Sequence, residues 1–135
     1  MANALYAKAK EALLEGLMDL TDDSIKVALV KSTYSVDLAV HEYYSDVESH
    51  TAAVSEILSG RSTASGIFDA ENITIEDYGT SGFSYLIIFK DTGNSATSRL
   101  IGYIDTAEGL PVSSSASALS ITINWSNTVS KIFSL

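Results

Sequence analysis

Asp91-Thr92-Gly93 comes closest to a catalytic motif in this chain, and it directly follows the apolar run Tyr85–Phe89. An Asp-Thr-Gly turn behind a hydrophobic strand is how an aspartic protease presents its catalytic carboxylate. Such an enzyme needs two of these turns facing each other, because the two carboxylates share one proton. A chain of 135 residues with one such turn would have to dimerise to be a protease.

Three features of the neighbouring sequence argue against a protease. Lys90 stands directly before Asp91, where an apolar side chain normally packs, and Asn94-Ser95 replaces the small apolar pair expected after Gly93. Gly102 follows Asp91 by only eleven residues, which leaves no room for a flap. Asp, Thr, Gly, Asn and Ser all favour turns, so the motif predicts the loop of a β-hairpin.

His41 and His50 lie nine residues apart in a polar segment that also contains Glu42, Asp46 and Glu48. Imidazole and carboxylate groups bind zinc and other transition metals, so a metal site is one interpretation. We favour the other interpretation, in which both histidines lie on a solvated surface. A further acidic group lacks the spacing of an EF-hand and consists of Asp69, Glu71, Glu76 and Asp77. We expect neither a metal ion nor another cofactor.

No other pattern in the sequence indicates an enzyme. The chain has no cysteine, which excludes disulfides, thiol nucleophiles and cysteine-based zinc sites. No serine lies in a Gly-x-Ser-x-Gly elbow, and the eight glycines form no phosphate-binding loop. We therefore expect a protein without catalytic activity.

The charge of the chain argues against nucleic acid as a partner. Its 17 acidic and 8 basic residues give a formal net charge of −9, and the basic residues are spread along the chain. A polyanion would be repelled by such a surface. The sequence also contains no apolar run near the roughly 20 residues that span a bilayer and no signal-peptide pattern at its start. We expect a protein that is used in the cytosol or is carried out of a cell by something else.

Residues 3–18 are predicted to form an amphipathic helix. Leu5, Ala9, Leu13 and Leu17 recur every four residues, and Gly16 weakens the end of the helix. Packing of this helix on its own domain is the expected arrangement, and docking on a neighbouring subunit is the alternative.

The rest of the chain is typical of short β-strands separated by turns. Residues 31–49 are expected to form a long ordered loop with a helical turn, and Ala52–Leu58 is ambiguous between strand and helix. Trp125 shares an alternating strand with Ile121 and Ile123, which predicts that it packs in the core. Strands are predicted at residues 25–30, 64–68, 73–78, 85–89, 100–104, 119–125 and 131–135. Together these segments predict a single domain over residues 1–135: a mainly β fold, with the helix at 3–18 and an antiparallel β-sandwich of jelly-roll type over 25–135.

Two stretches resemble a family of small virion structural proteins of tailed bacteriophages: YLIIFKDTGNSATSRLIGYIDTAEGLPV at residues 85–112 and LSITINWSNTVSKIFSL at residues 119–135. The start of the chain is also similar, so the resemblance spans nearly its full length. Its most specific part is Lys90–Gly93 with Thr97–Leu100 and Asp105–Val112. Family members carry a Pro-Asn-Gly-Gly type of turn where this chain has Ser113–Ser117, which puts that turn in doubt.

The resemblance implies a structural role in a virion and no reaction. A capsid decoration, or cement, protein would bridge major capsid subunits on the capsid surface after assembly in the host cytoplasm. It would bind the major capsid protein and further copies of itself. The alternatives are a neck or tail component, such as a ring or fibre-attachment protein, and a receptor- or glycan-binding module that uses aromatic side chains for stacking. The residues expected to touch a partner are Leu5, Tyr6, Tyr43, Tyr44, Asp91, Thr92 and Asn94.

Overall fold

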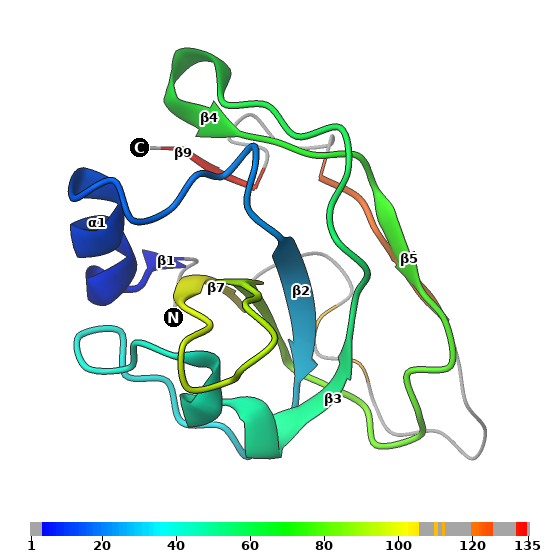
Figure 1. The fold of residues 1–135 in the computed structure, drawn as a ribbon. Coiled ribbons are helices and arrows are strands. Elements are labelled where there is room, and N and C mark those ends of the chain that lie inside the picture. The colour runs from blue at the N-terminus through cyan, green and yellow to red at the C-terminus, as the bar shows by residue number, and fades with distance from the viewer. Residues whose placement is uncertain (1–3, 106–109, 111, 113–119, 126–131, 135) are drawn as a thin grey trace.

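The chain is built around a five-stranded antiparallel sheet with the strand order β1-β7-β6-β2-β3 (Figure 1). The structure, a computed structural model, describes residues 4–105, 110, 112, 120–125 and 132–134. The sheet contains β1 (Ala4–Leu5), β2 (Ile25–Val30), β3 (Thr51–Val54), β6 (Tyr85–Lys90) and β7 (Leu100–Ile104). The other elements are α1 (Ala7–Leu14), the 3₁₀ turns η1 (Tyr44–Asp46), η2 (Glu48–His50) and η3 (Ala64–Gly66), and the strands β4 (Ile67–Phe68), β5 (Ile73–Ile75), β8 (Ile121–Ile123) and β9 (Phe133–Ser134).

The centre of the sheet is the ladder between β2 and β6. It runs without a break from Ile25 opposite Lys90 to Val30 opposite Tyr85. Half of the β2 residues and four of the six β6 residues are β-branched or aromatic, which favours strands, and nearly all of these side chains are buried. Strands buried on both faces form near-continuous apolar runs, and these runs are what predicted both strands from the sequence.

The strand register assigns side chains to the two faces of the sheet. Ala28, Ile87 and Tyr103 are paired neighbours and share one face, because opposed residues in an antiparallel sheet point to the same side. Leu29, Leu86 and Ile104 share the other face. Figure 1 shows α1 and much of the segment 31–50 on one side of the sheet, and β5 on the other. The core therefore lies in two layers, one on each side of β2 and β6.

The N-terminal helix is shorter than the sequence predicted. Residues 4 and 5 form β1, which pairs with β7 through Leu5 opposite Gly102, and the helix begins only at Ala7. Sheet pairing therefore outweighs the helical periodicity of Leu5. The buried helical residues are Ala9 and Ala12, whereas Leu17, expected on the buried stripe, is about half exposed. Small side chains on the buried side let the helix lie close to β7.

Two further strand pairs complete the mainly β fold. β4 pairs with β9, and β5 pairs with β8, both antiparallel. The predicted strands at 25–30, 85–89 and 100–104 are confirmed, and those at 64–68, 73–78, 119–125 and 131–135 are present as shorter strands. The ambiguous segment 52–58 contributes to β3, and the loop at 31–49 contains helical turns. Residues 113–117, where the sequence departs from the family it resembles, lie outside the described residues.

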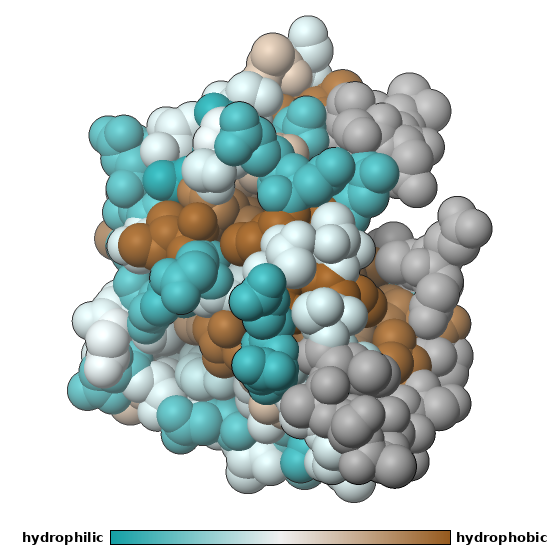
Figure 2. All heavy atoms as spheres, turned by 90° about the vertical axis from the view of Figure 1, so that its right-hand side faces the viewer, coloured by the Kyte–Doolittle hydropathy of each residue, from teal (hydrophilic) through white to brown (hydrophobic). Residues whose placement is uncertain are grey.

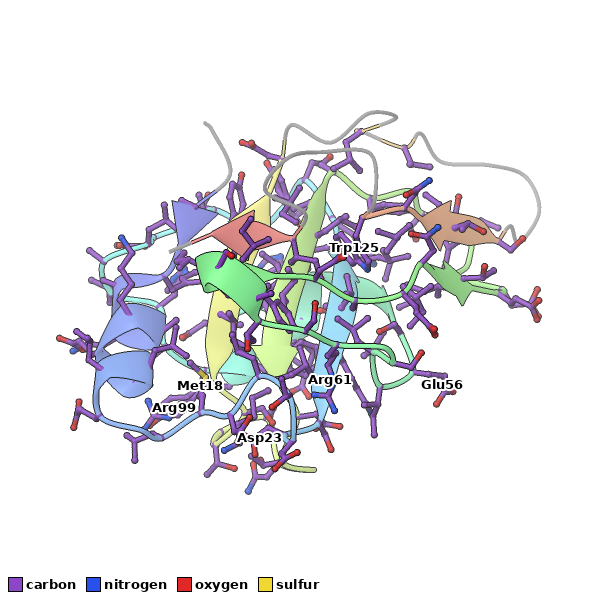
Figure 3. All side chains as sticks on the ribbon, turned by 90° about the horizontal axis from the view of Figure 1, so that it is seen from above. Met18, Asp23, Glu56, Arg61, Arg99 and Trp125 are labelled. Carbon is purple, nitrogen blue, oxygen red and sulfur yellow. The ribbon has the colours of Figure 1, made fainter. Side chains whose placement is uncertain are left out.

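Trp125 is almost completely buried, which confirms its predicted place in the core. Its backbone N–H donates to the side-chain oxygen of Asn72 at 3.0 Å, which ties the residues after β8 to those before β5. Figure 3 shows Trp125 among the strands at the centre of the molecule.

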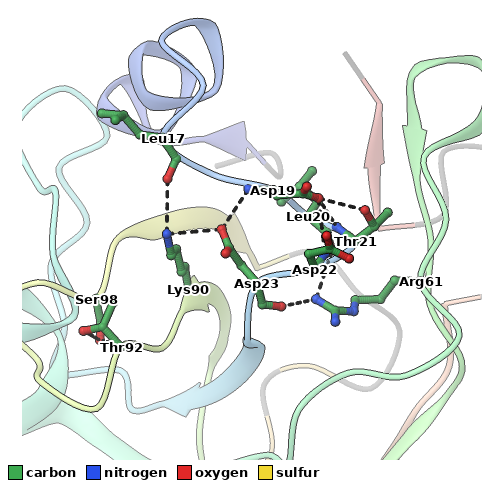
Figure 4. A network of polar contacts seen from close by, with 10 residues as sticks. All are labelled: Leu17, Asp19, Leu20, Thr21, Asp22, Asp23, Arg61, Lys90, Thr92 and Ser98. Carbon is green, nitrogen blue, oxygen red and sulfur yellow. Dashed lines mark hydrogen bonds and ion pairs between the residues drawn. The ribbon is translucent and has the colours of Figure 1, made fainter.

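Two cations hold the segment between α1 and β2 against the rest of the chain (Figure 4). The ammonium group of Lys90 lies 3.2 Å from the Asp23 carboxylate and donates to the Leu17 carbonyl at 3.2 Å. Arg61 donates to the backbone carbonyls of Leu20 and Asp23. These bonds satisfy carbonyl groups that no helix or strand pairs.

Candidate partner-binding surface

The structure brings together two segments that the sequence suggested separately as contact regions, the Tyr43-Tyr44 segment and the hairpin loop between β6 and β7. The backbone N–H of Tyr44 donates to the Ser98 carbonyl at 2.7 Å, and that of Ser45 donates to Ser95 at 3.0 Å. Tyr43 and Arg99 form an isolated antiparallel bridge. Residues 42–45 and 91–99 therefore form one continuous surface, which we call the loop surface.

The hairpin part of the loop surface is stabilised by its own polar groups. Asn94 caps the turn, because its side-chain oxygen accepts the Ala96 N–H at 2.9 Å and its carbonyl accepts the Ser98 hydroxyl at 2.9 Å. The hydroxyl groups of Thr92 and Thr97 lie 2.6 Å apart. Gly93 has a φ of +85°, a conformation that glycine adopts without strain. The loop is thus a preformed shape whose Thr92 and Asn94 side chains remain exposed.

Asp91 acts in this structure as a turn residue and an ion-pair partner. Its carboxylate lies 2.8 Å from the Lys26 ammonium group and accepts the Gly93 N–H at 2.9 Å. The Lys26 ammonium and the Gly93 N–H together lower the pKa of the Asp91 carboxyl below its ordinary value. Since β6 and β7 pair directly on either side, the prediction of a hairpin turn is confirmed.

The aromatic residues of the loop surface are partly covered by their own neighbours. The Arg99 guanidinium lies 5.3 Å from the centre of the Tyr43 ring and is paired with Glu42 at 2.9 Å. Tyr44 stacks on Phe89, with ring centres 4.4 Å apart and planes inclined by 11°. Both tyrosines remain half-buried, so each is still partly exposed to solvent.

The structure places the remaining predicted contact residues differently. Leu5 is half-buried in β1. Tyr6 is fully buried, and its hydroxyl lies 2.9 Å from that of Tyr34. Tyr6 in this fold is a core residue and is not exposed to a partner. Sequence reasoning missed Arg99 and Glu42, because their pairing joins distant parts of the chain and leaves no local signal.

His41 and His50 are brought close to the same tyrosine. Nδ1 of His41 lies 2.7 Å from the Tyr34 hydroxyl, and the ring of His50 lies 5.9 Å from the Tyr34 ring. Both histidines are half-buried and hydrogen-bonded, in contrast to the solvated surface position that we expected. Among the described residues, no three histidine, aspartate or glutamate side chains are grouped so as to hold a metal ion.

Several large apolar side chains reach the surface of the described part of the chain. The most exposed is Leu14 at the end of α1, at 88%, and the others are Leu17, Val40, Val54 and Ile57. Seen from the β5 side, Figure 2 shows hydrophobic atoms at the surface between hydrophilic ones. Single exposed apolar residues are common on soluble domains and do not by themselves mark a contact.

No described helix is long and apolar enough to cross a membrane, since α1 has eight residues and a span needs about 20. Comparison with known proteins identifies no relative: no family model, curated protein or solved structure matches this chain.

Proposed function

We propose that this chain is a non-enzymatic structural protein of a tailed-phage virion, and specifically a capsid decoration protein that binds the major capsid protein and further copies of itself. The resemblance of residues 85–112 and 119–135 to virion proteins motivates the proposal. The structural observation that supports it best is the exposure of Leu14, because a leucine left in water on a short helix is stabilised when a partner covers it.

Leu14 lies on the surface of α1 away from the side that packs on the sheet. Ala9 and Ala12 already provide the buried contacts of the helix, so Leu14 contributes little to the stability of the isolated domain. An apolar residue of this kind is suited to a pocket on a neighbouring subunit, where full burial of a leucine side chain contributes about 1.5–3 kcal/mol.

The loop surface provides a second, more polar contact. It is preformed by the hydrogen bonds of Asn94 and by the Tyr43–Arg99 contact, so little conformational entropy is lost on binding. The net charge of −9 favours a location on the outer side of the capsid, away from the packaged DNA.

The proposed architecture is an antiparallel sandwich of jelly-roll type. Its first layer is the five-stranded sheet, and its second layer is built from the β4–β9 and β5–β8 pairs. The position of β5 across from β2 in Figure 1 supports this arrangement.

The glycan-binding alternative has less support from the aromatic side chains. Tyr34 and Trp125 are buried, the Tyr43 ring is covered on one face by Arg99, and Tyr44 stacks on Phe89. A neck or tail protein would use the same exposed residues as a decoration protein, and copy number separates the two.

Quantitative mass spectrometry of virions from the phage that encodes this chain tests the proposal. A decoration protein is expected at about one copy for every one to three major capsid subunits, in keeping with the symmetry of the shell. A ratio of roughly one to a hundred would contradict decoration and favour a neck or tail location. Absence from the particle would contradict any virion role.

A Leu14→Gln variant tests the contact itself. We expect it to fold with a free energy of unfolding within about 0.5 kcal/mol of the native protein, and to lose binding to capsids that lack the protein. The matched control is Ala7→Gln, which places the same side chain on an exposed position at the other end of α1 and should bind normally. Undiminished capsid binding by Leu14→Gln would exclude α1 as the contact.

A further inference from the structure

A chain of hydrogen bonds runs from the core to the surface through three titratable side chains. The Tyr6 and Tyr34 hydroxyls lie 2.9 Å apart, and the Tyr34 hydroxyl lies 2.7 Å from Nδ1 of His41. Tyr6 and Tyr34 are both buried, while His41 is partly exposed to water. Solvent protons can therefore reach the outer end of a chain that begins in the core.

The direction of these hydrogen bonds follows from one backbone group. The N–H of Asp37 donates to Nδ1 of His41 at 3.3 Å, and a backbone N–H can only donate. Nδ1 therefore carries its single lone pair, which the Asp37 N–H and the Tyr34 hydroxyl share, and His41 is neutral with its proton on Nε2. The Tyr34 hydroxyl must donate to Nδ1, and its oxygen is left to accept the proton of Tyr6.

Both phenols keep their protons throughout the range in which histidine titrates. Burial raises the pKa of Tyr34 to about 12, and burial together with the Tyr34 hydroxyl raises the pKa of Tyr6 as well. Of the three residue types in this chain of hydrogen bonds, only histidine ordinarily changes its charge between about pH 5 and pH 8.

The hydrogen-bond chain holds residues 31–42, which we call the strap, against the start of α1. One backbone bond joins the strap to the helix, from the Ala7 N–H to the Leu38 carbonyl at 2.8 Å. Tyr6 in turn is held to β7 through its N–H, which donates to the Ile101 carbonyl at 3.1 Å. The side-chain bonds of Tyr34 and His41 are thus the second attachment between the strap and the N-terminal elements.

We propose that the strap is a pH-controlled latch: it is closed while His41 is neutral and is released from the start of α1 when His41 takes up a proton. An imidazolium has no lone pair, so Nδ1 can no longer accept from Asp37 or from Tyr34. The Nδ1–H of the imidazolium could donate to the Tyr34 oxygen only if the Tyr34 and Tyr6 hydroxyl groups exchanged their donor and acceptor roles. The Tyr6 hydroxyl, which is fully buried, would then have no acceptor among the described residues.

The surrounding charges do not cancel this effect. Asp37 accepts the Ala39 and Val40 N–H groups through Oδ1, and Asp46 accepts the Glu42 N–H through Oδ2. Both carboxylates are exposed and close to His41 in sequence, so they favour the imidazolium in the closed and the open strap alike. The other titratable groups around the chain of hydrogen bonds are Lys8 on α1, His50 on η2, Tyr103 on β7, Tyr85 on β6, Glu42, and Arg99, which is paired with Glu42.

The protonation state of the imidazole provides the first test. The ¹⁵N chemical shifts of the His41 ring at pH 8 should be those of the neutral form protonated on Nε2. A ring protonated on Nδ1 at that pH would overturn the assignment of hydrogen-bond directions and with it the latch.

Amide hydrogen exchange provides the decisive test, with Ala7 as the reporter of strap closure. The protection factor of the Ala7 amide, corrected for the intrinsic pH dependence of exchange, should fall by about tenfold or more between pH 8 and pH 5, because a buried hydroxyl loses its partner. Protection of β6 amides should not change over the same range. A constant Ala7 protection factor in the native protein would refute the latch.

Three variants identify the group responsible. In His41→Asn the side-chain oxygen can accept from Tyr34 but does not titrate, so Ala7 should stay protected at both pH values. The matched control His50→Asn should switch like the native protein. Tyr34→Phe breaks the chain of hydrogen bonds and should leave Ala7 poorly protected at every pH. His41 would be excluded as the sensor if the protection factor of the Ala7 amide still depended on pH in His41→Asn, or if it no longer depended on pH in His50→Asn.

Discussion

Ser55 completes the hydrogen bonding of β2 at the point where β3 ends. It is almost fully buried, and its Oγ accepts the Val27 N–H at 2.9 Å and donates to the Glu56 carbonyl at 2.7 Å. Val27 pairs with Ile88 of β6 on one side, but on the other side β3 has no strand residue opposite it. One hydroxyl group therefore replaces a backbone partner inside the core.

We expect Ser55→Ala to destabilise the protein by about 1–3 kcal/mol, because the buried Val27 N–H would lose its side-chain acceptor. Urea unfolding measures the change in the free energy of unfolding. Ser35→Ala is the control, since Ser35 is exposed, and it should change stability by less than about 0.5 kcal/mol. Equal effects of the two substitutions would show that the Ser55 hydroxyl is not needed by Val27.

Asp91 combines two interactions that different substitutions can separate. Asp91→Asn keeps an oxygen that can accept the Gly93 N–H and removes the ion pair with Lys26, whereas Asp91→Ala removes both. The lowered pKa of the carboxyl means that the ion pair stabilises the protein at neutral pH, and that this contribution is lost as the pH falls through the lowered value.

At pH 7 we expect Asp91→Asn to be less stable than the native protein by up to about 1 kcal/mol, as is usual for a partly exposed ion pair. The difference should be absent at an acidic pH below the lowered pKa of Asp91, where the native carboxyl is also neutral. Asp91→Ala should be less stable than Asp91→Asn at both pH values. Urea unfolding at the two pH values measures these differences, and a pH-independent loss in Asp91→Asn would show that the Lys26 pair contributes nothing.

At the scale of elements, the end of α1 is defined by backbone conformation more than by side-chain pattern. Gly16 has a φ of +74°, its N–H donates to the Leu13 carbonyl, and the Leu17 N–H donates to the Ala12 carbonyl. This is the Schellman arrangement, which needs a left-handed residue directly after the helix cap. The sequence indicated that Gly16 weakens the helix, and the structure shows that it ends it.

Gly16→Ala should cost about 1–2 kcal/mol, because a side chain strains the left-handed conformation even though the space around it is empty. The control is Gly102→Ala in β7, whose φ is not positive and whose added Cβ would meet its nearest neighbour, the Leu5 Cδ2 atom, at an ordinary 3.6 Å. Thermal or urea unfolding should show a clearly smaller loss for Gly102→Ala. The reverse order would mean that close packing of β1 on β7 matters more than the end of the helix.

At the scale of the whole molecule, most of the sheet is made from distant parts of the chain. β1 at the start of the described chain pairs with β7. β2 pairs with β6, although the strap, η1, η2, β3, η3, β4 and β5 lie between them in the sequence. The buried side chains form one continuous core cluster that includes Tyr6, Phe68 and Trp125. A core of this kind links the five-stranded sheet to the β4–β9 and β5–β8 pairs.

We therefore expect a single cooperative unfolding transition. Trp125 is the one tryptophan of the chain and reports on the β5–β8 side, while far-ultraviolet circular dichroism reports mainly on the sheet. Both signals should give the same urea midpoint, as in two-state unfolding. An earlier midpoint for Trp125 fluorescence would show that the two-stranded pairs unfold separately from the five-stranded sheet.

The sequence by itself determined the local features: the apolar strands at 25–30 and 85–89, the turn at Asp91–Gly93, the burial of Trp125 and the acidic charge. Each of these depends on residue type, on a short periodicity or on a count, all of which can be read along the chain. Only the tertiary structure decided that Tyr6 lies in the core, that residues 42–45 border the hairpin loop, and that His41 ends a chain of hydrogen bonds from the interior. Strand partners and side-chain contacts between distant residues depend on packing and on the competition among possible pairings. Leu5 is an example, since it lies in β1 and pairs with β7 although its spacing predicted a helix. No local pattern encodes that choice.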